Sequence, residues 1–256
     1  YACDPCDPRF AGYPEGHYDR PPGFDASSWV DQHPVCNEMD RRLDDIYDDE
    51  QPMRASTNAA KLFVRELIDP LHDQIGYVTY STGAQIESEL QCLRRLGSGN
   101  CNAQVLEDTV VAALDATRAG GSTDIAGGMI KGLEVLSTDE NHYGRASATH
   151  VMILMTDGRA NQTPNTDCYS DDNRKWVSPD GTQGNNAQHC VIYYAHEARD
   201  QNVIVYTISL GGAADFELMD EVAALTGGVH RNADRPEMLP AIFQELYELM
   251  YLRLVE

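Results

Sequence analysis

The chain has 256 residues, of which 42% are hydrophobic, enough to bury a core in one large domain or in one domain with an appendage. Its 41 acidic and 19 basic residues give a formal net charge of −22, which argues against nucleic acid or an anionic membrane as a partner. The sequence has no run of about 20 apolar residues, so we expect no membrane insertion by this chain.

Residues 1–50 differ from the rest of the chain in composition. They are rich in proline, aspartate and tyrosine and have no sustained hydrophobic period. We expect an irregular Cys/Pro-rich N-terminal head or insertion over 1–50, followed by a folded domain over 51–256. The start at Tyr1, without a signal peptide, favours a processed fragment of a longer precursor. The acidic run 44–50 is interpreted as a solvated face, with calcium binding as the alternative, because it lacks the glycine and spacing of an EF-hand loop.

From Pro52 onward, hydrophobic periodicity predicts a regular alternation of helices and strands. Helices are expected over 52–69, 102–117, 124–136, 187–200, 216–225 and 236–255, and strands over 74–82, 84–90, 149–155, 203–210 and 229–232. A polar stretch, 159–186, separates the apolar strand 149–155 from the next helix. This order predicts an α/β fold with a doubly wound, mainly parallel sheet that carries helices on both faces.

The seven cysteines predict a set of disulfides in an oxidising, extracellular compartment, with scattered free thiols as the alternative. Two pairs bracket polar segments, so we expect disulfides between Cys92 and Cys101 and between Cys168 and Cys190. The remaining three lie in the head: Cys3, Cys6 and Cys36. They are expected to form one further bridge and to leave one sulfur free or bonded to another chain.

Polar residues at two loops indicate a cation site. The strand 149–155 runs into Thr156-Asp157-Gly158, and a Gly-rich loop opens the helix 124–136 with Thr123 and Asp124. Loops at the carboxyl ends of the strands of an open α/β sheet converge, and threonine and aspartate oxygens suit Mg²⁺ or Ca²⁺. As alternatives, Thr123 is a helix N-cap and Asp157-Gly158 is only a turn. Asp124 is expected to cap the helix or to support the metal ligands without binding the cation itself.

Several motifs in order resemble the von Willebrand factor type A domain, from Pro52 to the C-terminus. They are the helix 53–64, the strand 75–82, the loop 121–125, the strand end 154–158 and the strand 205–211. Within that family the chain is most similar to bacterial surface proteins of the tight-adherence pilus-assembly type.

This resemblance implies a metal-ion-dependent adhesion site, built from DxSxS after the first strand, a threonine in a second loop and an aspartate in a third. Thr123 and Asp157 match the last two parts. DxSxS is absent, and no apolar strand precedes Pro52. We therefore expect the first strand and its DxSxS on a separate segment or another subunit, paired beside the strand that ends at Asp157. A degenerate domain with a rebuilt edge is the other interpretation.

The sequence favours a non-catalytic adhesion or protein-interaction module, extracellular or on a cell surface, that captures a partner carboxylate through the cation. The second hypothesis is a structural subunit of an extracellular filament or pilus, whose missing strand comes from another segment or chain. An enzyme, such as a hydrolase that uses the cation as a Lewis acid, is disfavoured because the sequence has no GxSxG, HExxH or P-loop motif.

Overall fold

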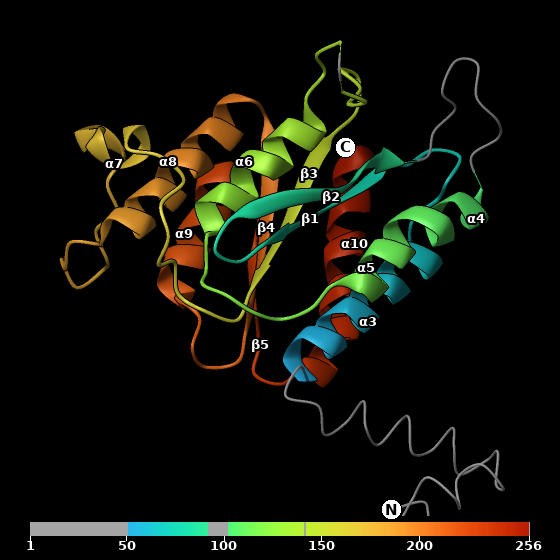
Figure 1. The fold of residues 1–256 in the computed structure, drawn as a ribbon. Helices are drawn as coiled ribbons and strands as arrows, with labels where there is room; N and C mark the ends of the chain where they lie inside the picture. The colour runs from blue at the N-terminus through green and yellow to red at the C-terminus, as the bar shows by residue number, and fades with distance from the viewer. Residues whose placement is uncertain (1–50, 92–101, 141, 256) are drawn as a thin grey trace, which may run out of the picture. The chain divides into compact units, whose positions relative to one another are not determined.

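The computed structural model describes residues 51–91, 102–140 and 142–255 (Figure 1). The predicted head, with Cys3, Cys6, Cys36 and the acidic run, lies outside the described residues, and so does the predicted Cys92–Cys101 pair. The described elements are α3(Gln51–Glu66), β1(Ile75–Tyr80), β2(Ala84–Gln91), α4(Ala103–Leu106), η1(Glu107–Val111), α5(Ala112–Ala116), α6(Ile125–Leu136), β3(His150–Thr156), α7(Asp167–Ser170), η2(Asp172–Arg174), α8(Asn186–Asp200), β4(Val203–Leu210), α9(Phe216–Thr226), β5(His230–Ala233), η3(Pro236–Met238) and α10(Leu239–Val255).

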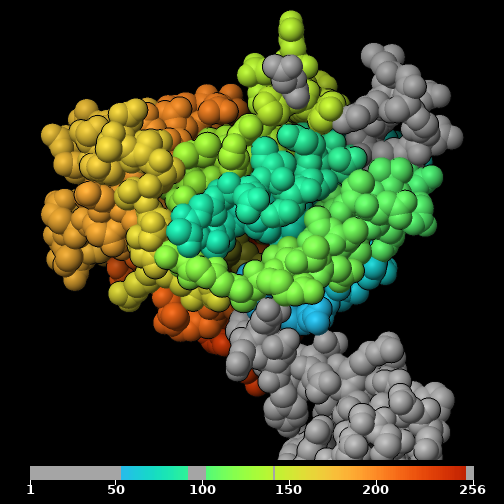
Figure 2. Space-filling view, in the orientation of Figure 1, coloured from blue at the N-terminus to red at the C-terminus, as the bar shows by residue number. Residues whose placement is uncertain are grey.

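The described residues form an α/β fold with helices on both faces of its strands, as predicted. Strands β3, β4 and β5 form a parallel sheet in that order, and β1 pairs with β2 in a separate antiparallel hairpin. One face packs against α6, α8 and α9, and the other against α3, α5 and α10 (Figure 1). In Figure 2 the hairpin (teal) forms part of the visible surface beside α5 and α6.

Strand β4 shows why its sequence is apolar along almost its whole length. Val205 lies in the core on the α8–α9 side, whereas Tyr206 and Ile208 lie in the core on the α3–α10 side. The polar side chain of Thr207 is fully buried, and its hydroxyl donates to the Met219 carbonyl at 2.9 Å. Both faces of β4 are therefore covered, as expected for a parallel strand between two helical layers.

The predicted helix 102–117 is not continuous. A π-helical turn, η1, separates α4 from α5. Within it the Thr109 hydroxyl donates to the Val105 carbonyl at 2.6 Å, a local bond that competes with the regular helical pattern. On the same turn Glu107 receives two hydrogen bonds from the guanidinium of Arg65, at 2.5 and 2.6 Å. Hydrophobic periodicity predicts where the helix lies, but it does not predict the local change from α-helical to π-helical hydrogen bonding.

The polar stretch after β3 is fixed to α8. Cys168 and Cys190 form the predicted disulfide, with their Cα atoms 4.6 Å apart and both side chains fully buried. Further along the segment, the backbone N–H of Trp176 donates to Nδ1 of His189 at 2.9 Å. These two contacts hold the middle of an otherwise polar segment, at Cys168 and Trp176, against buried residues of α8.

Removing the Cys168–Cys190 bond should destabilise the domain. The bond closes a separation of 22 residues, so Cys168→Ala with Cys190→Ala is expected to lower the free energy of unfolding by about 2–4 kcal/mol. Urea denaturation of the oxidised protein and the double variant measures the difference. Peptide mapping without reduction must recover the linked pair, and native protein in which both thiols alkylate would contradict the assignment.

The stability of the domain should fall with acid partly through His189. Burial lowers the pKa of His189, and the nearby charge of Lys175 adds to this effect. The unfolded chain takes up this proton near pH 6.5 and the folded chain only at lower pH, so this contribution is complete above about pH 6.5 and is lost as pH falls through the folded pKa. His189→Gln should therefore flatten the decline of unfolding free energy below about pH 6.5.

The control for this measurement is His72→Gln, because the His72 side chain is 79% exposed. Urea denaturation over a pH series compares both variants with the unsubstituted chain. Parallel stability curves for His189→Gln and the unsubstituted chain would show that His189 does not cause the decline.

Candidate functional site

The loop that precedes α6 lies against the carboxyl ends of β1 and β3. On the β1 side, the N–H of Asp124 donates to the Ser81 carbonyl at 2.8 Å. On the β3 side, a Cβ added at Gly158 would lie only 3.0 Å from Oγ1 of Thr123. Glycine at position 158 therefore allows the Thr123 hydroxyl to approach the turn that carries Asp157. The two predicted site residues come together at this edge of the strands.

Asn161 holds the two loops together. The N–H of Thr123 donates to Oδ1 of Asn161 at 2.8 Å, and the N–H of Asn161 donates to the Thr123 carbonyl at 3.1 Å. Sequence reasoning missed this role, because an asparagine in a polar stretch is an ordinary turn residue. The paired bonds fix the backbone of Thr123 relative to the loop that follows β3.

The cap of α6 is Asp124 and not Thr123. The Asp124 carboxylate is almost fully buried and accepts the N–H of Gly127 at 2.9 Å. This geometry confirms the expected capping role of Asp124. It also rules out the capping alternative for Thr123 and leaves its hydroxyl available to another partner.

Asp157 presents a carboxylate at the surface of the same edge. Its side chain is exposed, and within the described part of the chain it makes no hydrogen bond or ion pair. Burial raises the pKa of the Tyr80 hydroxyl well above its ordinary value, and the charge of Asp157 acts in the same direction. The Asp157 carboxylate thus lies within electrostatic reach of Tyr80, at the end of β1.

The site supplies part of a ligand set for a hard cation. Thr123 and Asp157 offer a hydroxyl and carboxylate oxygens, which Mg²⁺ and Ca²⁺ prefer. Across the described residues, no three His, Cys, Asp or Glu side chains gather as a metal cluster. Since Ca²⁺ takes about six to eight oxygens and Mg²⁺ about six, further oxygens are needed to complete the site.

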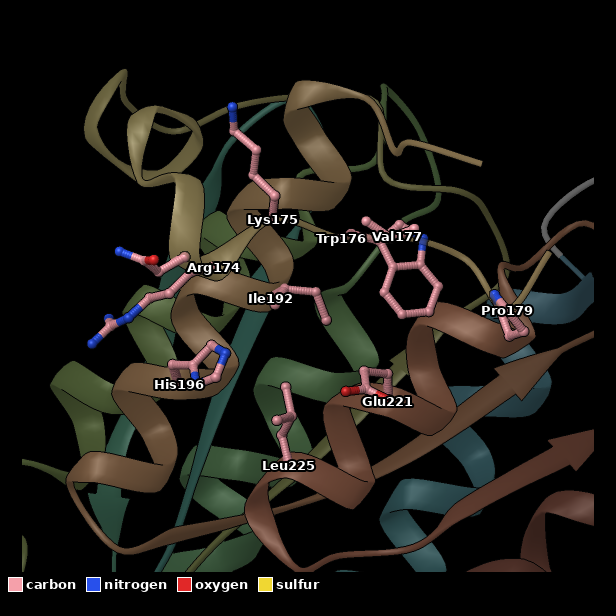
Figure 3. A pocket seen from close by; sticks show the side chains of 10 residues that line it. Arg174, Lys175, Trp176, Val177, Pro179, Ile192, His196, Glu221 and Leu225 are labelled. Atoms are coloured by element: carbon pink, nitrogen blue, oxygen red, sulfur yellow. The ribbon is translucent and has the colours of Figure 1, made fainter. Parts of the chain in front are cut away.

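A hollow of about 350 Å³ lies away from this edge, between the polar stretch and helices α8 and α9 (Figure 3). Its lining includes the side chains of Trp176, Ile192 and His196. Arg174 at its rim pairs with Glu197 at 2.5 Å, so its charge is already compensated. None of the residues that line this hollow is a serine, threonine or cysteine, and the hollow therefore presents no hydroxyl or thiol nucleophile.

Comparison with known proteins identifies the architecture. A family model, described as the von Willebrand factor type A domain, matches residues 49–245. The pilus adhesin SpaC from Lactobacillus rhamnosus GG is similar in structure, with a TM-score of 0.56 and 15% sequence identity over 81% of this chain and 29% of that one. Proximal thread matrix protein 1 from the mussel byssus, with a zinc-occupied MIDAS motif, has a TM-score of 0.54 and 18% identity over 79% of this chain and 44% of that one.

The von Willebrand factor domain of the type V pili tip protein Mfa5 from Porphyromonas gingivalis has a TM-score of 0.50 and 15% identity, over 78% of this chain and 88% of that one. No curated protein matches the chain in sequence. By the coverages given above, the chain spans less than half the length of the mussel protein and of SpaC. In the described parts of residues 51–255, none of the helices has the length and apolar character of a membrane span.

Loss of the Asn161 side chain should loosen the site without unfolding the domain. Asn161→Ala removes the acceptor for the Thr123 N–H and should lower the unfolding free energy by about 1 kcal/mol. Amide exchange should accelerate at Thr123, as measured by NMR. The matched control is Asn173→Ala, an exposed asparagine on the polar stretch. Unchanged exchange at Thr123 in Asn161→Ala would contradict the proposed role.

Proposed function

We propose that this chain, which belongs to the von Willebrand factor type A domain family, is a non-catalytic adhesion and protein-interaction module, placed outside the cell or on its surface. The observation that carries the proposal is the pairing of the Thr123 hydroxyl with the exposed Asp157 turn at one edge of the strands. Mg²⁺ or Ca²⁺ held there would keep a coordination position open for a carboxylate of a protein partner.

The charge of the chain supports a role for the cation. With a formal net charge of −22, the protein repels an acidic partner at long range. A divalent cation between Asp157 and a partner carboxylate turns this repulsion into a local attraction, because the cation is the largest charge in its surroundings. Capture of a partner should therefore depend on the cation and not on the protein surface alone.

A DxSxS segment would complete the ligand set. Its aspartate and serine oxygens would add to those of Thr123 and Asp157 and bring the site closer to the number that a hard cation requires. In this proposal the segment follows an apolar strand beside β3. The structural relatives agree in kind with this proposal: the mussel protein has a zinc-occupied MIDAS motif, SpaC is a pilus adhesin and Mfa5 is a pilus tip protein.

A structural subunit of an extracellular filament or pilus is the second candidate. The observation that favours it is the break between the β1–β2 pair and the β3–β4–β5 sheet, which exposes strand edges to another segment. Electron microscopy of the purified protein separates the candidates, because regular polymers support the filament and dispersed particles support the adhesion module.

Cation binding should depend on both predicted ligands. Thr123→Ala combined with Asp157→Ala removes the hydroxyl and the carboxylate, and is expected to abolish binding of Mg²⁺ and Ca²⁺. Isothermal titration calorimetry should use the chain with a DxSxS segment supplied, because two ligands alone bind weakly. Asp139→Ala is the matched control, since Asp139 is an exposed carboxylate beyond the opposite end of α6.

Unchanged affinity in the double variant would place the cation elsewhere, with the acidic run 44–50 as the next site to test. Loss of affinity in Asp139→Ala of the same size as in the double variant would show a nonspecific effect of charge. Either result would contradict the proposed site.

A further inference from the structure

The hollow beside α8 and α9 combines apolar walls with one unpaired carboxylate. Ile192 of α8 and Leu225 of α9 line it together with the indole of Trp176. Glu221 lies one turn before Leu225 on the same face of α9 and also lines the hollow. Its carboxylate is exposed, and within the described part of the chain it makes no hydrogen bond or ion pair. Figure 3 shows all four side chains directed toward a common space.

The two basic residues at the rim are already paired. The guanidinium of Arg174, which pairs with Glu197, also lies over the ring of Tyr193, with 4.9 Å between Cζ and the ring centroid. The ammonium of Lys175 pairs with Asp172 at 2.5 Å. In Figure 3 both charged ends point away from the hollow. Neither of them therefore compensates the carboxylate inside it.

His196 is the remaining titratable residue of the lining, and it adds no positive charge at pH 7. Burial lowers the pKa of its imidazole, and the charges of Arg199 and Arg174 act in the same direction. Because an ordinary histidine has a pKa of about 6.5, the ring of His196 is neutral at pH 7. The lining thus carries one uncompensated charge, which is the negative charge of Glu221.

The wall formed by Trp176 is fixed before any ligand arrives. Besides the bond from its N–H to His189, the Trp176 carbonyl accepts the N–H of Gly184 at 3.0 Å. A Cβ added at Gly184 would lie only 2.7 Å from Cδ1 of the indole, so the glycine backbone packs directly against this ring. The Trp176 side chain is only 6% exposed. A wall that is already ordered lowers the entropy cost of binding.

The size and chemistry of the hollow suit a long side chain with a positive end. Its volume of about 350 Å³ is at the small end of the range of ligand pockets. A methylene stem would bury its apolar surface against Ile192 and Leu225, as the stems of long cationic side chains do. The positive end would meet the Glu221 carboxylate and the negative face of the indole. An anionic group would be repelled by the same carboxylate.

Lysine matches these walls better than arginine does. Its ammonium is a compact charge on a flexible four-carbon stem, which suits an apolar surface that ends at a single carboxylate. The planar guanidinium of arginine is a fork that is best satisfied by several acceptors in one plane. Among the ionisable groups that line the hollow, Glu221 is the one carboxylate.

We propose that the hollow lined by Trp176, Ile192, Glu221 and Leu225 is a docking site for a lysine side chain of a partner protein. The formal net charge of −22 attracts a basic segment at long range, and the hollow then selects one of its side chains. This inference goes beyond the proposed function, because it requires neither a cation nor the Thr123 and Asp157 site. The two sites contact groups of opposite charge on a partner.

The test is an NMR titration of the whole chain with Nα-acetyl-lysine methylamide as the probe. The indole N–H of Trp176 and the amides of Ile192 and Leu225 should shift together along one saturating curve. Nα-acetyl-norleucine methylamide keeps the carbon stem and lacks the ammonium. It should bind about fivefold more weakly, because it loses the contact with the carboxylate.

Glu221→Gln provides the second arm of the test. It should weaken binding of the lysine probe about fivefold and leave binding of the norleucine probe unchanged. Glu217→Gln is the matched control, since Glu217 is an exposed residue one turn earlier on α9 and does not line the hollow. It removes the same charge from the same helix and should leave the affinity for both probes unchanged.

Equal affinities for the lysine and norleucine probes would show that the hollow recognises apolar groups only. Equal losses in Glu221→Gln and Glu217→Gln would show a diffuse attraction to the acidic surface. Shifts that spread over exposed carboxylates such as Asp139, without saturation at Trp176, would show the same. Each of these three outcomes overturns the proposal.

Discussion

The architecture depends on the backbone hydrogen bonds of its parallel strands. A strand between two layers of helices is shielded from water, so each N–H and C=O needs a partner on a neighbouring strand. Strand β4 meets this requirement on both edges, and it has the most completely buried side chains. Among the described residues, strand β3 meets it on one edge only, and its apolar side chains other than Leu154 are half-buried. Both strands are largely apolar in sequence, so their difference in burial goes with the number of paired edges that each has among the described residues.

The same constraint positions the candidate site. Because β1 and β3 run in one direction, their following loops lie at one edge, where Asn161 and Gly158 bring Thr123 to the Asp157 turn. The buried carboxylate of Asp124 caps the start of α6, so the Thr123 hydroxyl is not needed as a cap. The loops are thus tied to each other and to the helix, while the Asp157 carboxylate stays exposed. Such an arrangement suits capture of a ligand at the surface better than chemistry in an enclosed pocket.

The sequence predicted the fold well because the signals were local and periodic. Strands such as β4 are apolar over their whole length, and the long helices carry an apolar stripe, so their types and order could be read directly. The approach of the Thr123 loop to the turn after β3 was also expected, because loops converge at the carboxyl ends of the strands of an open α/β sheet. The Cys168–Cys190 bond was predicted from its position around a polar stretch.

Other features had no local signal. The π-helical turn at Glu107 depends on a hydrogen bond between Thr109 and Val105, and the clamp at Asn161 depends on two loops that are far apart in sequence. The open edge of β3 in the described part of the chain was expected only through the family resemblance, together with the lack of a DxSxS motif in the sequence. Its half-buried residues, Val151 and Ile153, look in sequence like those of a fully covered strand, because hydrophobicity does not report how many neighbours a strand has.

The position of a bound cation tests the proposed site at Thr123 and Asp157 most directly. Crystals of the chain with an apolar strand and DxSxS supplied should be grown with Mn²⁺, whose anomalous scattering locates it without assumptions about the ligands. An anomalous peak is expected in contact with the Asp157 carboxylate and near the Thr123 hydroxyl. A peak elsewhere in the protein, with the Asp157 edge empty, would contradict it.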